Sequence, residues 1–255
     1  KFSNVMYSPK SYNNKFGVPL SLFNLEQYHD YGVFEVGMDR KGEIDSLSKI
    51  IKPDIAVITN ISYAHIKNFK NIRQIALAKS EIISNIKKGG SLVLNADDKF
   101  FKLHRKIAIQ KKIKVYSFSL KKDGTNINLK GIKKLGKKFI INIKINEKEK
   151  SFIVSSNFEN YIKNILAAIT VISIFKKENY IDRNIFDDFK MPSGRGDISR
   201  IKIGKKSIFL IDESYNSNPL SVKSAIENFN DIDIQNNKKH LILGDMLELG
   251  THSKK

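Results

Sequence analysis

Polar side chains suited to catalysis follow several apolar segments in the first third of the sequence. Glu35 is the only charged residue inside one such segment, Thr59 and Asn60 end the next, and His65 follows within one turn. The carboxyl ends of parallel strands line the ligand crevice of an open sheet, so we expect these side chains to lie close together. A carboxylate with one imidazole suits Mg²⁺ or Mn²⁺ better than zinc. The simpler alternatives are a carboxylate that caps a loop amide and a histidine that is an ordinary surface or core residue.

Lys79 falls on the apolar face of a predicted helix. The apolar residues of that face recur at helical spacing, with Lys79 among them: Ile72, Ile75, Ala76, Ile83 and Ile86. A lysine in such a stripe can extend along it and keep its ammonium group in water. Otherwise it is held there by a phosphate, by a carboxylate or by chemical modification.

Two further segments carry polar groups at positions where the chain must turn. Arg195 stands between Gly194 and Gly196, and an arginine on a backbone that allows close approach suits a phosphoryl group. A simple basic turn is the alternative. The segment 212–219 follows a predicted strand and holds two acids, a tyrosine and two asparagines, which is more than a helix cap requires. A similar segment follows at 244–250.

The elements that would position these groups alternate along the chain. Apolar segments predict strands at 31–37, 54–60, 91–95 and 114–118, and the segments between them predict helices over 43–51, 71–87 and 99–110. Segments 139–145 and 151–154 predict an antiparallel insert, followed by a helix over 160–176. Segments 206–211, 219–229 and 240–244 predict a second β-α-β unit. We therefore expect an α/β fold, a mostly parallel sheet flanked by helices, with a domain boundary after residue 196.

Composition limits the classes of protein that fit. The chain has 255 residues, of which 41% are hydrophobic, so it can form a core; it has no cysteine, which excludes disulfides and zinc–thiolate sites. No apolar run reaches the roughly 18 residues of a membrane span. The first residues show no targeting segment, so we expect a cytoplasmic protein.

The formal net charge of +19 raises the alternative of a nucleic-acid-binding module. Only six of the 45 basic residues are arginine, the residue that favours specific contacts to bases and phosphates. The lysines are spread over the whole chain rather than clustered. We therefore favour dispersed surface charge over a nucleic-acid interface.

A series of short motifs resembles those of the Mur ligases over nearly the whole chain. In order, these motifs lie at 11–14, 17–20, 35–39, 42–44, 59–65, 78–82, 94–98, 160–168, 194–196, 212–219 and 244–250. Ser-Tyr-Asn-Asn (11–14), Ser-Tyr-Asn-Ser-Asn-Pro (214–219) and Gly-Asp-Met-Leu-Glu-Leu-Gly (244–250) are similar to one branch. Members of that branch use ATP to join D-Ala-D-Ala to UDP-N-acetylmuramoyl-tripeptide in peptidoglycan synthesis.

The resemblance implies a role for each matching residue. Glu35 would hold the Mg²⁺ that bridges the ATP phosphates, and His65 and Lys79 would serve catalysis at a second Mg²⁺, with Lys79 commonly carbamylated in the family. The residues implied to contact ATP are Asn160, Asn164, Arg195, Glu213 and Tyr215. Those implied to contact the UDP-muramoyl substrate are Ser11, Asn13, Asn14, Thr59 and Asn60.

The sequence also departs from the family pattern. The glycine-rich phosphate loop and the N-terminal domain are absent, Glu159 stands where the family has histidine, and Glu213 stands where it has aspartate. Residues 1–196 would form most of the central ATP-binding domain and 197–255 the beginning of a C-terminal Rossmann-like domain. We expect these 255 residues to be inactive alone. Folylpolyglutamate synthase, which has a similar ATP-binding architecture, is the alternative ligase.

Overall fold

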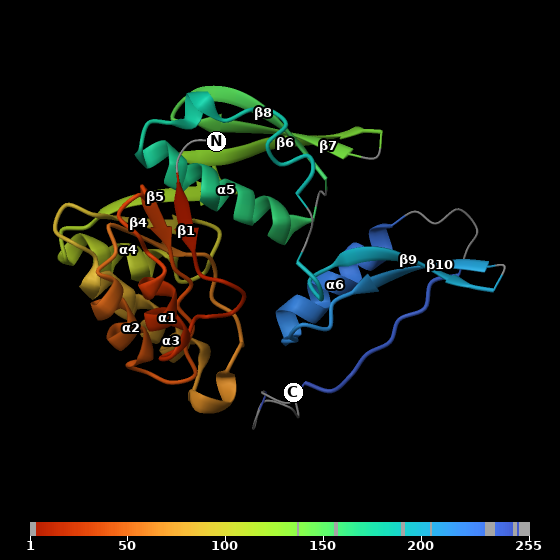
Figure 1. Cartoon of the computed structure of the whole chain (residues 1–255). Coiled ribbons are helices and arrows are strands. Elements are labelled where there is room, and N and C mark those ends of the chain that lie inside the picture. The colour runs from red at the N-terminus through yellow and green to blue at the C-terminus, as the bar shows by residue number, and fades with distance from the viewer. Residues whose placement is uncertain are drawn as a thin grey trace.

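A six-stranded sheet organises the larger part of the computed structural model, which describes residues 4–136, 138–155, 158–189, 192–204, 206–232, 238–246 and 249, without the side chains of Glu159 and Asn160 (Figure 1). The strand order is β3-β4-β5-β6-β7-β8. Its strands are β3 (Ile55–Ile58), β4 (Ser91–Asn95), β5 (Lys114–Ser119), β6 (Ile127–Leu135), β7 (Lys138–Ile145) and β8 (Lys148–Val154). Strands β3 to β6 run parallel, and β6, β7 and β8 pair antiparallel, which confirms the expected fold class.

Helices cover both faces of this sheet. Strand β4 is buried throughout: Leu92 and Leu94 pack into one core with α2, α3 and α4, while Val93 packs into a second core with α5. The alternation follows from the two-residue period of a strand. The helices are α2 (Glu43–Ile51), α3 (Ile72–Lys79), α4 (Phe101–Gln110) and α5 (Glu159–Ile174). The carboxyl ends of β3, β4 and β5 therefore open at one edge between the two helical layers.

A separate two-stranded parallel sheet carries the first polar motifs. It pairs β1 (Val5–Tyr7) with β2 (Tyr31–Val33), and α1 (Gly17–Phe23) lies between them in sequence. The predicted strand over 31–37 is thus too long, and its placement in the same sheet as residues 54–60 is wrong. Strand β2 ends at Val33 because β1 supplies only three pairing residues, so Glu35 lies in the loop that follows.

The predicted helix over 71–87 is shorter than its apolar pattern. The α-helix α3 ends at Lys79, and the chain tightens into a 3₁₀ helix over Ser80–Asn85. The predicted apolar face itself is confirmed, since Ile75, Ala76 and Ile83 are buried in the first core. The change of helix type places Lys79 at the end of α3, where its side chain reaches the sheet edge.

The last part of the described chain forms a hairpin and one helix. Strands β9 (Asp197–Ile203) and β10 (Lys206–Asp212) pair antiparallel, and α6 spans Pro219–Asp231 with Asn218 as its N-cap. These elements lie apart from the two sheets (Figure 1). The predicted strand over 240–244 is wrong: this segment runs as an extended chain with Ile242 93% exposed, because none of the described strands lies beside it to accept its hydrogen bonds. The predicted β-α-β unit is therefore not formed.

Candidate functional site

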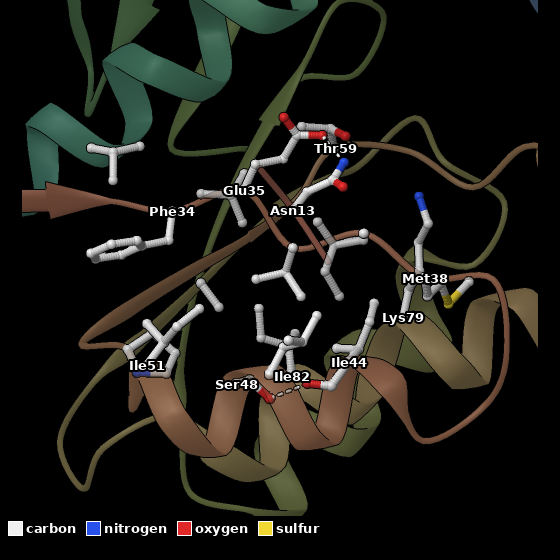
Figure 2. A pocket seen from close by; sticks show the side chains of 18 of the residues that line it. Asn13, Phe34, Glu35, Met38, Ile44, Ser48, Ile51, Thr59, Lys79 and Ile82 are labelled. Carbon is white, nitrogen blue, oxygen red and sulfur yellow. Dashed lines mark hydrogen bonds between the residues drawn. The ribbon is translucent and has the colours of Figure 1, made fainter. Parts of the chain in front are cut away.

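A cavity of about 1900 Å³ lies between the two sheets and contains most of the predicted site residues. Its lining includes these predicted residues: Asn13, Asn14, Glu35, Thr59, His65, Lys79, Arg195 and Tyr215. Figure 2 shows Asn13, Glu35 and Thr59 together at one side, with the Lys79 nitrogen directed to that side and Ile44 and Ile82 on the side of α2. The cavity thus has a polar rim at the strand ends and an apolar interior.

Glu35 is held at this rim by the loop that precedes α1. Asn13 Nδ2 donates a hydrogen bond of 2.8 Å to Glu35 Oε1, and the Gly37 N–H donates one of 2.7 Å to the Asn13 carbonyl. A Cβ on Gly37 would lie 2.9 Å from Asn13 Cγ, so a larger residue at position 37 would displace the Asn13 amide from its place beside Glu35. Asn13 therefore orients the Glu35 carboxylate, a contact that the sequence motifs did not predict.

His65 faces an aspartate that the sequence motifs contain but to which they assign no role. His65 Nδ1 lies 2.8 Å from Asp39 Oδ1. The Asp39 loop is fixed by Glu43, whose carboxylate accepts the backbone N–H groups of Asp39 at 2.6 Å and Arg40 at 3.0 Å. The bond from the Asp39 N–H is the largest cause that lowers the pKa of Glu43. Spacing alone could not reveal this contact, because it joins two separate loops.

Lys79 is partly exposed to the cavity, but protein atoms surround its amine. Lys79 Nζ donates a hydrogen bond of 3.2 Å to the Asn60 carbonyl. Burial lowers the pKa of Lys79, and the negative charge of Asp98 opposes that effect. The 3₁₀ helix after Lys79 is anchored by Glu81, which accepts the N–H groups of Gly42 and Asp45 at the start of α2. Glu81 is a positioning residue that sequence reasoning missed.

Arg195 reaches the cavity from the turn that precedes β9. Its guanidinium carbon lies 4.2 Å from the centre of the Tyr215 ring, and the Tyr215 N–H donates to the Gly194 carbonyl at 3.0 Å. Gly194 has φ = +74°, and a Cβ there would lie 2.9 Å from Tyr215. The Tyr215 hydroxyl is hydrogen-bonded to Ser11 Oγ. Two predicted ATP contacts and one predicted substrate contact therefore form a connected group.

The remaining predicted residues are placed less directly. Glu213 lies beside Gly196, and burial, followed by the charge of Asp212, raises the pKa of Glu213. Asn14 Oδ1 accepts the N–H groups of Phe16 and Gly17, which fixes the turn into α1. Asn164 is exposed on α5, and the Asn160 side chain lies outside the described residues. Asn164 is not among the described residues of the cavity lining.

The donor set at the rim is suited to Mg²⁺ held together with a substrate. Among the described residues, no three histidine, aspartate or glutamate side chains meet closely enough to form a metal cage by themselves. Mg²⁺ generally keeps several waters and is bound through one or two carboxylates plus substrate phosphates. Glu35 lines the cavity and offers such a carboxylate, and the His65 imidazole lines the same cavity. Lys79 as an ammonium group cannot bind a metal, since it has no lone pair.

Comparison with known protein families shows to which family the chain belongs. The family model described as "Mur ligase middle domain" matches residues 1–172. The chain belongs to the Mur ligase family. None of the described helices of this Mur ligase chain combines the length and hydrophobicity needed to cross a membrane.

Several relatives of this Mur ligase chain carry a more specific name. The UDP-N-acetylmuramoyl-tripeptide–D-alanyl-D-alanine ligase of Rickettsia prowazekii (strain Madrid E) is 31% identical over 254 residues, which is 98% of this chain and 55% of the relative. The ligase of the same name from Bacillus subtilis (strain 168) is 30% identical over 249 residues, 94% of this chain and 50% of the relative. The chain thus spans about half the length of the curated relatives it matches.

Solved structures agree with this placement. MurF from Acinetobacter baumannii superimposes with a TM-score of 0.83 at 27% identity, covering 99% of this chain and 53% of that one. MurF from Thermotoga maritima in complex with ADP gives 0.83 at 25%, covering 99% and 56%. Folylpolyglutamate synthetase from Lactobacillus casei gives 0.60 at 18% identity, with 86% of this chain and 51% of that one covered, a likeness of fold alone.

Proposed function

We propose that this chain is part of a MurF-type ligase that uses ATP to join D-Ala-D-Ala to UDP-N-acetylmuramoyl-tripeptide. The observation that carries the proposal is one cavity lined by Glu35, His65, Lys79 and Arg195 in a chain that D-Ala-D-Ala ligases match over nearly its whole length. These groups are a carboxylate, an imidazole, an amine and a guanidinium. Together they suit binding and transfer of a phosphoryl group.

We assign residues 1–196 to the central ATP-binding domain and 197–255 to the beginning of the C-terminal domain. The support for the boundary is the Gly194–Gly196 turn, whose two glycines have φ of +74° and +88° and precede the separate β9–β10 hairpin. We place the reaction in the cytoplasm, where ATP is available. Peptidoglycan precursor synthesis and cell-wall formation follow from the substrates.

The proposed reaction has two steps, the formation of an acyl phosphate and its attack by an amine. An oxygen of the tripeptide carboxylate attacks the γ-phosphorus of ATP, which releases ADP and forms an acyl phosphate. The amine of D-Ala-D-Ala then attacks the acyl carbon and forms a tetrahedral intermediate. This intermediate breaks its bond to the phosphate oxygen and gives up the amine proton to the departing phosphate, leaving the amide. Such phosphoryl transfer depends mainly on positioning and on neutralising negative charge.

The residues of the rim divide this work. Bound Mg²⁺ would neutralise charge on the phosphates. Glu35, oriented by Asn13, would hold the ion at the ATP phosphates, and His65 would serve a second site near the substrate carboxylate. Arg195, stacked on Tyr215, would face the phosphate chain from the turn between Gly194 and Gly196.

Lys79 fits this proposal best as a carbamate. A neutral amine attacks CO₂, and loss of the proton leaves an anionic oxygen group that can bind Mg²⁺. Burial favours the neutral amine, because it lowers the pKa of Lys79. This chemistry explains why a lysine stands on an inward helix face next to the Asn60 carbonyl.

The binding assignments follow the motifs shared with the family. We assign Ser11, Asn13, Asn14, Thr59 and Asn60 to the UDP-muramoyl substrate. We assign Asn160, Asn164, Glu213 and Tyr215 to ATP, with Asn160 and Asn164 towards the adenine.

A substrate panel on the full-length gene product tests the proposal. Continuous, multiple-turnover ADP release should require both UDP-N-acetylmuramoyl-tripeptide and D-Ala-D-Ala, and glutamate should not replace the dipeptide. Turnover with folate and glutamate, without muramoyl substrate, would instead support a folylpolyglutamate synthase. Tight, sequence-specific nucleic-acid binding that resists physiological salt would instead support a nucleic-acid-binding module.

A further inference from the structure

The turn after β4 carries two adjacent aspartates that bond in opposite directions. Asp98 Oδ2 accepts the Ile61 N–H at 2.7 Å, in the loop after β3. Asp97 Oδ1 accepts the Ser119 hydroxyl at 2.6 Å, and Asp97 Oδ2 accepts the Leu120 N–H at 2.7 Å, at the end of β5. Because β4 lies between β3 and β5, each carboxylate ties β4 to a different neighbouring strand.

The Asp98 contact differs because a second side chain, Lys79, holds the other end of the same peptide group. The Ile61 N–H and the Asn60 carbonyl belong to one peptide unit, and Lys79 Nζ donates to that carbonyl at 3.2 Å. The peptide unit therefore has a carboxylate at its N–H and an amine donor at its oxygen. Reversing this peptide would set its oxygen against Asp98 and its N–H against Lys79, so its orientation is fixed.

This peptide unit carries the part of the loop that faces the cavity. Ile58 and Ile61, on either side of Thr59 and Asn60, are 7% and 5% exposed and pack in the first core. Thr59 lies on the cavity lining. Asp98 is itself fixed, since its Oδ1 accepts the Phe100 N–H at 2.7 Å. The loop is thus anchored by two buried side chains and by the contacts at one peptide.

We propose that Asp98 is a positioning residue that, together with Lys79, clamps the Asn60–Ile61 peptide and so holds Thr59 and Asn60 at the rim of the site. The clamp links the loop after β3, the end of β4 and the end of α3. Its value for substrate binding rests on the proposed function, whereas the clamp itself does not. Asp97 has no part in it.

Hydrogen exchange on the full-length protein tests the clamp, with Asp98→Ala and Asp97→Ala as matched variants. A charge-assisted bond protects the Ile61 amide, so Asp98→Ala should speed its exchange about tenfold or more while the Leu120 amide stays protected. Asp97→Ala should give the opposite pattern. Unchanged exchange at Ile61 in Asp98→Ala, or equal acceleration of both amides in both variants, would overturn the proposal.

Asp98→Asn covers the case in which Asp98→Ala fails to fold. The uncharged amide cannot accept both N–H groups, so exchange at Ile61 or Phe100 should still accelerate and exchange at Leu120 should not. Unchanged exchange at both Ile61 and Phe100 would contradict the clamp.

Kinetic measurements then test the clamp and the proposed function separately. A KM for the UDP-linked substrate raised about fivefold by Asp98→Ala, with a smaller change in kcat and none in Asp97→Ala, supports both. The expected exchange pattern without any muramoyl-peptide ligation would sink the proposed function and leave the clamp.

Discussion

The six-stranded sheet and the β9–β10 hairpin use similar residues in opposite ways. In the sheet, Ile143 and Phe152 are at most 1% exposed under the surrounding helix and strands. In the hairpin, Ile203 and Phe209 are 62% and 73% exposed. Both regions alternate apolar and polar residues, so the pattern by itself does not determine burial. The sheet holds its own core, whereas the hairpin presents an apolar surface that no described element covers.

The difference extends to the site residues that each region carries. Thr59 and Lys79 stand on elements packed in the first core and are joined through the clamped peptide. Arg195 and Tyr215 depend on a few contacts at the turn and on the bond to Ser11. We therefore expect substitutions in the sheet to change stability and those near the hairpin to change mainly ligand binding.

The largest contrast should appear in stability. Phe152→Ala removes a fully buried ring, and we expect the free energy of unfolding to fall by about 3–5 kcal/mol. Phe209→Ala, in the hairpin, should change it by no more than about 0.5 kcal/mol. Urea denaturation of the two variants measures both values. Equal losses would show that the hairpin is as tightly packed as the sheet.

The next effect concerns turnover rather than stability. Lys79→Ala should lower ligation by about 10²–10³-fold, because it removes the carbamate that would hold the second Mg²⁺ near the substrate carboxylate. Added bicarbonate should increase the activity of the wild type and leave the variant unchanged. Initial rates of ADP release, with circular dichroism to monitor folding, give the answer. A variant with wild-type turnover would remove Lys79 from the chemistry.

A smaller effect is expected where the hairpin region meets the Ser11 loop. Tyr215→Ala removes the ring under Arg195 as well as the hydroxyl bonded to Ser11, and should raise the KM for ATP about tenfold. Tyr215→Phe keeps the ring and should raise it only about threefold. Equal effects of both changes would assign the whole contribution to the hydroxyl.

The smallest effect concerns the protonation of Glu213. Burial and two neighbouring aspartates raise the pKa of Glu213 above 4.5, while Arg195 lowers it. A group with a raised folded pKa contributes stability below pH 4.5 that is lost as the pH rises through the folded value. Arg195→Ala should raise the pKa of Glu213 further and extend that range upwards. An NMR titration of the Glu213 carboxyl carbon measures it, and a lowered pKa in the variant would contradict the arrangement.

Local patterns in the sequence were sufficient to predict the parallel strands of the large sheet and the helices that connect them. The alternation of apolar segments predicted β3, β4, β5 and the helices between them, and helical spacing placed Lys79 on an inward face. The extra pairing of β1 with β2 was not predictable, because a three-residue strand has almost no pattern of its own. The absence of a strand at 240–244 has the same origin, since pairing depends on a distant partner.

Contacts between loops were the part of the site that the sequence could not provide. Asp98 lies 37 residues from Ile61, and Glu81 lies 39 residues from Gly42. Each contact depends on the order of strands and on a helix end, which no local spacing encodes. The residues with chemical roles could thus be proposed from motifs, while those that position them became visible only in three dimensions.

An ¹⁸O label shows directly whether the tripeptide carboxylate is activated as an acyl phosphate. The full-length gene product is supplied with ATP, D-Ala-D-Ala and UDP-N-acetylmuramoyl-tripeptide whose terminal carboxylate carries ¹⁸O. Our account predicts that each ligation places one ¹⁸O in the released phosphate, because that oxygen bridges the acyl phosphate. Ligation that leaves the released phosphate free of label would contradict it.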